Sequence, residues 1–232
     1  MGDFLRGVLD DPRLLWFVAR ATGLVCLVLL TVTVVLGITA STRLASAGWP
    51  RFVTQGLHRN VSLYVLALLA AHIAAVVADN FVPLYLKDAV VPFVAAYRPI
   101  WLGLGVLSLH LLLALVVTSL LRQRLGYGTW RVVHWIAYLS WPLALLHGLG
   151  TGSDPRRGGV VALTAICGAS VLAAVLWRIV AGWPTRRTLR LGAALVTVSA
   201  VAATVVWARQ GPLAPGWGKR AGTPSAPASG GK

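Results

Sequence analysis

Long apolar runs alternate with short polar segments along the 232-residue chain. About 20 residues of helix cross a bilayer core of ~30 Å, and six of the runs reach that length. The pattern therefore predicts six transmembrane helices and no separate water-soluble domain. The expected spans are roughly 14–38, 57–79, 99–121, 131–150, 160–182 and 188–208.

The segments outside these spans have distinct patterns. Residues 1–13 do not resemble a cleaved signal peptide, and we interpret them as a short N-terminal segment before a domain at 14–210. Between the second and third spans, "NFVPLYLKDAVVPFVAAYRP" contains Pro83 and Pro92. It is a poor spanning helix, so we expect an interfacial or short re-entrant segment. Residues 211–232 are rich in Gly, Pro, Ala and Ser and are expected to form a disordered tail or an extended peptide.

Composition supports a membrane protein. Hydrophobic residues make up 57% of the chain, charged residues only 12%, and the mean hydropathy is +0.77. The net charge of +15 comes from arginines and lysines between the apolar runs, where they indicate contact with anionic lipid rather than with nucleic acid. There is no glutamate and there are six aspartates, which excludes sites built from carboxylate clusters. Cys26 and Cys167 each lie alone in an apolar run, so we interpret them as packing residues.

Two of the expected spans each carry a pair of histidines. His58 and His72 lie in "LHRNVSLYVLALLAAHIAAVVAD" with 13 residues between them, and His134 and His147 lie in "WRVVHWIAYLSWPLALLHGLG" with 12 between. At ~1.5 Å per residue the two members of a pair are ~21 Å and ~19 Å apart along the helix. Each helix thus carries one imidazole near each membrane face, where a polar side chain is costly and usually functional.

The two histidine-bearing helices are separated by one span, so they run parallel. His58 then comes level with His134, and His72 with His147. Two imidazoles at each of two levels fit two b-type haems whose irons each take one axial nitrogen from each helix. The sequence therefore predicts an all-α integral membrane protein, a bundle of six transmembrane helices holding two stacked b-type haems.

The rotational phase of the two pairs differs. At ~100° per residue, 14 steps return to within about 40° of the same helix face, whereas 13 steps miss it by about 140°. Pro142 lies between His134 and His147 and is able to kink or rewind that helix. The alternative is that the two haems sit at different azimuths.

Other sites fit the pattern less well. Copper in membranes usually takes Cys or Met ligands, and the only methionine is Met1. A catalytic zinc site gathers three ligands at one point. His110 has no partner at matching spacing, so we interpret it as a hydrogen-bonding residue. A transporter or channel that uses the histidines to relay protons or metal ions stays open as an alternative, and a reducible b-type spectrum distinguishes the two.

Arginines near the haem levels are candidate contacts for haem propionates, which favour bidentate Arg. Arg59 directly follows His58, Arg131 lies three residues before His134, and Arg20 lies near the start of the first span. Contact with lipid headgroups is the alternative interpretation. Lys and Arg are distributed almost evenly over the two faces, so their count does not decide the orientation.

The paired histidines, with "PIWLGLGVLSLHLLLALVVTSLLRQRLG" followed by "WRVVHWIAYLSWPLALLH", resemble the ferric reductase-like transmembrane domain. That family includes the NADPH oxidases, the ferric reductases and the haem-b membrane subunit of the bacterial methionine sulfoxide reductase system (YedZ-type), to which the chain is most similar. The resemblance covers roughly residues 17 to 190. It implies axial ligation by His58, His72, His134 and His147. Cytochrome b of the quinol-oxidising complexes also uses two histidine pairs, but its quinone-site motifs are not found.

The resemblance implies transmembrane electron transfer in a bacterial-type inner membrane. It places the loops before His58 and His134 in the cytoplasm and both termini outside. The expected donor is quinol or a flavoprotein or flavin on the cytoplasmic side. The expected extracytoplasmic acceptor is a partner reductase, a flavin protein or ferric ion. Two haem b are the expected cofactors, and a non-covalently bound flavin or quinone is a further candidate. No fused flavin and nicotinamide domain is expected, and the span at 188–208 lies beyond the shared core.

Overall fold

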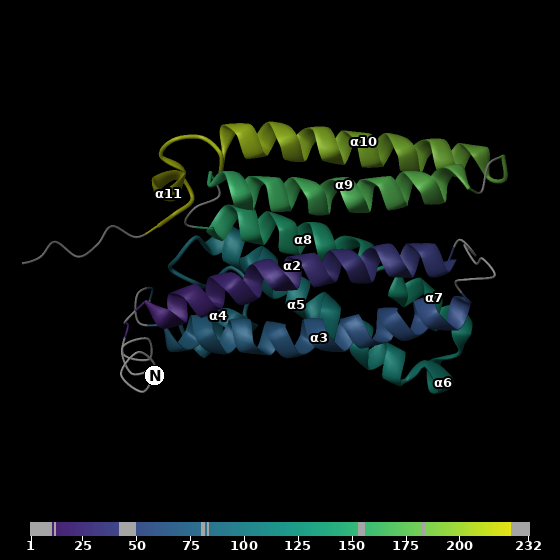
Figure 1. Cartoon of the computed structure of the whole chain (residues 1–232), viewed down its shortest axis with the longest axis horizontal. Coiled ribbons are helices and arrows are strands. Elements are labelled where there is room, and N and C mark those ends of the chain that lie inside the picture. Colours follow the sequence, from purple (N-terminus) through teal and green to yellow (C-terminus); the bar gives the residue numbers. More distant parts are fainter. Residues whose placement is uncertain are drawn as a thin grey trace, which may run out of the picture. The chain divides into compact units, whose positions relative to one another are not determined.

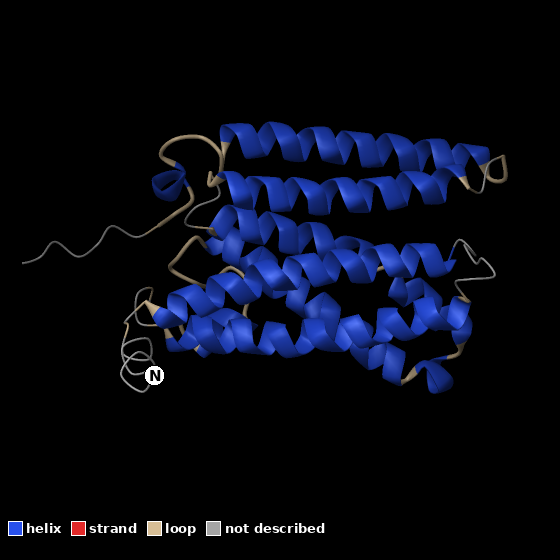
Figure 2. Ribbon diagram, viewed as in Figure 1, coloured by secondary structure: helices blue, strands red, loops and turns tan. Residues whose placement is uncertain are grey.

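Helices are the only regular elements among the residues that the computed structural model describes (Figure 2), which are 11, 13–41, 50–79, 82, 84–152, 156–181 and 184–223. Most of the predicted N-terminal segment and the end of the predicted tail fall outside these ranges. The helices, labelled in Figure 1, are α2 Leu14–Ser41, α3 Arg51–Ala78, α4 Leu86–Val90, α5 Pro99–Leu120, α6 Arg122–Leu125, α7 Tyr127–His134, α8 Ala137–Thr151, α9 Gly158–Val180, α10 Arg187–Gln210 and α11 Trp217–Arg220.

Six helical stretches are long and apolar enough to cross a membrane: α2, α3, α5, the combined stretch Tyr127–Thr151, α9 and α10. The prediction of six spans in an all-α chain is confirmed for the described residues, and the chain is a multi-pass membrane protein. α3 begins at Arg51 rather than near residue 57, directly after Pro50, whose extended backbone (φ −67°, ψ 149°) precedes the helix. His58 consequently lies inside the helix, in its third turn, and not beside its first residue.

The described residues form two compact units. The first unit takes residues from Met1–Asp79 and Arg156–Trp207, and therefore contains α2, α3, α9 and nearly all of α10. The second unit takes residues from Asn80–Pro155 and Ala208–Lys232, and contains α4 to α8 and α11.

The first unit is built on a hairpin of α2 and α3, which lie side by side in Figure 1. Its buried side chains include Leu30, Ile38 and Val65. The Cys26 Sγ lies 4.0 Å from the Val65 carbonyl oxygen across the hairpin. α9 packs against α2 and buries Cys167. Both cysteines are free thiols, in agreement with their interpretation as packing residues.

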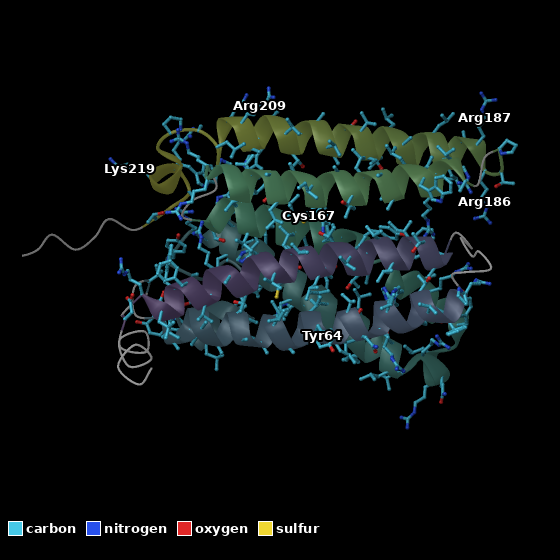
Figure 3. All side chains as sticks on the ribbon, viewed as in Figure 1. Tyr64, Cys167, Arg186, Arg187, Arg209 and Lys219 are labelled. Atoms are coloured by element: carbon cyan, nitrogen blue, oxygen red, sulfur yellow. The ribbon has the colours of Figure 1, made fainter. Side chains whose placement is uncertain are left out.

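Helix α10 buries none of its residues within the protein. Its start is held on the end of α9 by the Arg190 guanidinium, which donates to the carbonyl oxygens of Arg178 (3.1 Å) and Ile179 (2.7 Å). Figure 3 shows Arg187 near the start of α10 and Arg209 near its end, both pointing away from the ribbon. An apolar helix with cations at its two ends is the pattern of a lipid-exposed span.

The second unit is built on α5 and α8. Val106, Leu115 and Leu145 are buried, and the buried Ser108 hydroxyl donates to the Ser140 carbonyl oxygen at 2.9 Å. Among the described residues of the segment before α5, the only helix is the five-residue α4, which is too short to cross a bilayer. The expectation that residues 80–98 do not form a span therefore agrees with the structure.

The stretch Tyr127–Thr151 is interrupted between α7 and α8. Four i→i+3 backbone hydrogen bonds join residues 132 to 139 around Trp135 and Ile136. A 3₁₀ turn rotates by about 120° per residue against about 100° in an α-helix, so four or five tightened residues recover roughly 80–100° of the missing rotation. Pro142 lies inside α8 without interrupting it. The rewinding that we considered for Pro142 therefore occurs earlier, immediately after His134.

The predicted disordered tail is partly wrong. Residues 211–223 form turns and the short helix α11, and they belong to the second unit. The Trp217 ring lies 5.4 Å from that of Trp101 between centroids, and its Nε1–H donates to the Gly150 carbonyl oxygen at 3.0 Å. Composition suggested disorder, but this segment makes specific contacts: besides those of Trp217, the Arg98 backbone N–H donates to the Gly222 carbonyl oxygen at 3.0 Å. Residues 224–232 lie outside the described residues.

Candidate functional site

The imidazole of His72 is fixed by a main-chain carbonyl of the neighbouring helix. Its Nδ1 lies 2.7 Å from the Ala19 oxygen of α2. A carbonyl oxygen can only accept a hydrogen bond, so Nδ1 must carry the proton. In the neutral ring this places the coordinating lone pair on Nε2. A metal-ligating histidine usually has this arrangement, which sets its tautomer and ring orientation.

His58 repeats the arrangement on the same hairpin. Its Nδ1 lies 2.9 Å from the Thr33 carbonyl oxygen of α2. The two histidines are 14 positions apart on α3, and their acceptors, Ala19 and Thr33, are 14 positions apart on α2. Because the two helices are antiparallel neighbours, one register serves both contacts. The same-face placement predicted for His58 and His72 is therefore confirmed within this unit.

The second unit contains a third such contact. The His147 Nδ1, on α8, lies 3.0 Å from the Trp101 carbonyl oxygen of α5. His147 also receives support from its own helix, because the Thr151 hydroxyl donates to the His147 carbonyl oxygen at 2.7 Å. The Nδ1–H donor again makes Nε2 the nitrogen able to coordinate a metal.

His134 is held by a different contact. Its ring stacks on Trp130, one turn earlier on α7, with 4.8 Å between centroids and 29° between planes. The Arg122 guanidinium lies over the face of the Trp130 ring, 5.3 Å from its centroid, in a cation–π contact. The Trp130 Nε1–H donates to the Ser119 hydroxyl at 3.3 Å. The indole thus ties the start of α7 to the end of α5. It also limits the rotation of the His134 ring.

The remaining candidate residues are placed as follows. His110 is exposed on α5, and its assignment as a residue that does not bind iron stays a prediction. Arg59 is exposed on α3, and Arg131 is exposed on α7 with its guanidinium 5.9 Å from the Tyr127 ring. Arg20 is half-buried on α2, 5.1 Å from the Trp16 ring. All three cations are near an end of a span, and their role as propionate contacts stays a prediction.

Arg98 is a buried cation that the sequence reading did not single out. Only 6% of its surface is exposed. Its guanidinium donates to the carbonyl oxygens of Gly150 (2.9 Å) and Gly152 (3.1 Å) at the end of α8, and to the Thr223 hydroxyl (2.9 Å). A signal was present in the sequence, because Arg98 directly precedes Pro99 at the first position of a span, where a charged side chain must find oxygens or reach water.

The donor chemistry of these residues fits haem iron. Three imidazoles carry the Nδ1 proton and offer Nε2, the arrangement that a bis-histidine haem requires of its axial ligands. No three His, Cys, Asp or Glu side chains gather into one cluster among the described residues. The predicted pairing of His58 with His134 and of His72 with His147 joins residues of the two units and stays a prediction.

Fold and side chains together define a multi-pass helical membrane protein with histidine side chains inside its spans. The chain belongs to the family described as ferric reductase like transmembrane component, whose model matches residues 22–146. No curated protein and no solved structure is found to match the chain. The matched region runs from α2 into α8 and contains His58, His72 and His134, whereas His147 follows its last residue directly. Family membership suggests transmembrane electron transfer.

Proposed function

We propose that the protein transfers electrons across the membrane through two b-type haems. His58 and His134 bind the iron of one haem, and His72 and His147 bind that of the other. The observation that carries the proposal is the Nδ1–H contact of His58, His72 and His147 with main-chain carbonyls. A core or relay histidine can use either nitrogen, whereas an axial ligand must keep one nitrogen for iron and commonly donates through the other.

Each side chain has a defined task. The carbonyl of the neighbouring helix holds the Nδ1 proton and orients the ring, so the lone pair of Nε2 points in one direction. Haem ligated by two imidazoles supplies one-electron transfer with no coordination position for oxygen. Three arginines near the span ends would neutralise the haem propionates by charge-assisted hydrogen bonds: Arg20, Arg59 and Arg131. The apolar spans exclude water from the path.

The direction of transfer follows from the family resemblance. The donor is quinol or a flavoprotein or flavin on the cytoplasmic side, and the acceptor is an extracytoplasmic reductase, flavin protein or ferric ion. Among the relatives named above, the haem-b membrane subunit of the methionine sulfoxide reductase system fits best, since it is an electron conduit that works with separate partners. The transporter or channel alternative is not favoured, because the family is one of membrane reductase components.

The haem content tests the proposal directly. Pyridine haemochrome measured against protein concentration is expected to give about two haems per chain, because two imidazole pairs saturate two irons. The purified protein is expected to be coloured and to show a b-type spectrum on reduction. A colourless protein would contradict the proposal, and a ratio near one in fully loaded protein would mean that only one histidine pair binds haem.

Topology is tested separately. Six crossings place the two ends of the chain on the same side of the membrane, and the resemblance places that side outside. In intact spheroplasts, an epitope after Lys232 is expected to be cut by added protease, and an impermeant oxidant is expected to drain electrons from the reduced haems. An epitope that stays protected until the membrane is permeabilised would invert the order, with His58 and His134 binding the outer haem.

A further inference from the structure

We infer that three glycines are positioning residues for the histidines, an inference that rests on the proposed function for its haem readout. In each of the three histidine contacts, the residue whose carbonyl oxygen accepts the hydrogen bond lies four positions before a glycine of the same helix. The three sets are His72 with Ala19 and Gly23, His58 with Thr33 and Gly37, and His147 with Trp101 and Gly105. We refer to Ala19/Gly23, Thr33/Gly37 and Trp101/Gly105 as the carbonyl–glycine pairs.

Helix geometry explains the four-residue spacing. Within an α-helix, the carbonyl oxygen of residue i accepts the N–H of residue i+4. A side chain in a helix leans toward the N-terminus, so the side chain of residue i+4 covers the turn in which that carbonyl lies. With glycine at i+4 the oxygen is open from the side. An imidazole from the neighbouring helix can then donate to its second lone pair.

The contacts show how closely each glycine is approached. A Cβ placed on the glycine would meet the facing imidazole at distances that differ between the three pairs. A Cβ added to Gly105 would lie 2.5 Å from Nδ1 of His147. A Cβ added to Gly23 would lie 3.0 Å from Cε1 of His72, and one added to Gly37 would lie 3.3 Å from Cε1 of His58. At Gly105 the ring must move, at Gly23 it has almost no room, and at Gly37 it must give by a few tenths of an ångström.

Other glycines of the spans have no such neighbour. Nothing lies within 4 Å of a Cβ on Gly148, Gly168 or Gly192. A further glycine, Gly103, is closely approached, but by the Phe93 ring. Contact with a histidine is therefore a property of the carbonyl–glycine pairs and not of glycine in these helices generally.

The fourth histidine differs in sequence and in contact. Residues 106–125 of the chain contain no glycine, so α5 offers a carbonyl–glycine pair to His147 only. Thr118, 13 positions after Gly105, donates its hydroxyl to the Ala114 carbonyl oxygen at 2.7 Å, which uses the oxygen that a pair at this level would offer. His134 stacks on Trp130 instead. The two histidines of α7 and α8 are thus oriented by different means.

The test compares two alanine variants of α5. Gly105→Ala puts a methyl group against the His147 ring, whereas Gly103→Ala puts one against Phe93 and leaves the histidine contact alone. Gly168→Ala is the neutral control, and glycine to alanine raises helix propensity in all three. The readouts are haem per chain, the low-spin electron paramagnetic resonance signal of each haem, and the thermal midpoint of the protein in detergent.

Gly105→Ala is expected to lose or shift the signal of one haem, with the haem content falling toward one per chain. Gly103→Ala and Gly168→Ala are expected to keep both signals, whatever happens to the thermal midpoint of Gly103→Ala. If the wild type binds two haems and Gly105→Ala shows unchanged signals, the inference is overturned but the proposed function stands. Equal haem loss in Gly103→Ala would also overturn it, because tight packing alone would then be the cause. A wild type without haem would contradict the proposed function itself.

A milder variant keeps the inference testable if Gly105→Ala does not fold. Gly37→Ala has the longest contact, 3.3 Å, and is expected to fold with both haems bound. Its expected effect is a shift of the low-spin signal of the His58 haem, since the ring must tilt or move. A signal identical to the wild type would overturn the inference.

Discussion

In chains carrying either His58→Ala or His134→Ala, the same haem is expected to disappear, and the haem content is expected to fall from about two to about one per chain. The two substitutions act alike because each removes one axial nitrogen from the same iron. The other haem is expected to stay largely intact, since its ligands lie ~20 Å away along the helices. Reduced-minus-oxidised spectra and low-spin electron paramagnetic resonance signals of both variants measure the outcome.

The matched substitutions are His72→Ala and His147→Ala, which are expected to remove the other signal. His110→Ala is the control, because this exposed residue of α5 is not a predicted ligand. Its spectrum should be close to that of the wild type. Loss of a haem from His110→Ala, or loss of different haems from His58→Ala and His134→Ala, would show that the ligand assignment is wrong.

Arg98→Met is expected to lower the free energy of unfolding on the order of 3 kcal/mol, because hydrogen bonds to a charged group contribute about 1.5–3 kcal/mol each. The buried guanidinium links the end of α8 to the segment after α10 through Gly150, Gly152 and Thr223. Gly150 keeps a second donor, the Trp217 Nε1–H at 3.0 Å, so the loss falls mainly on Gly152. Thermal or denaturant unfolding in detergent measures it.

The effect of Arg98→Met should extend to haem. Arg98 lies three residues before Trp101, whose carbonyl oxygen accepts a hydrogen bond from His147 Nδ1–H. Loosening the start of α5 is therefore expected to weaken the binding of the His147 haem first. Arg209→Met is the control, because Arg209 is an exposed cation at the end of α10. Its expected change is within about 0.5 kcal/mol. Equal destabilisation by both variants would mean that the Arg98 contacts contribute little.

The six spans and the positions of the histidines could be predicted from the sequence, because both are local properties. A helix that crosses lipid must be apolar over about 20 residues, and the printed order of residues states this directly. The depth of each imidazole then follows from a rise of ~1.5 Å per residue. His58 and His72 are separated by the same number of positions as Ala19 and Thr33. This equality was also present in the sequence, but it has meaning only once α2 and α3 are known to be neighbours.

Other features depend on contacts between segments that are distant in the chain. Composition suggested a disordered tail, yet residues 211–223 pack on α5 and α8, because Trp217 finds both a ring and a carbonyl there. For the rotation between His134 and His147, the sequence offers only Pro142 as a residue able to kink or rewind the helix. The structure places the tightened turn at Trp135 and Ile136, and neither residue type predicts such a turn.

By itself, then, the sequence determined the class of protein, the number of crossings and the levels of the four imidazoles, since hydropathy and helical rise act along one chain segment at a time. Only the tertiary structure decided which nitrogen of His58, His72 and His147 carries the proton. That choice depends on a carbonyl of another helix and on the missing side chain of a glycine one turn further along. An acceptor across a helix interface exists only after the helices have packed in one register.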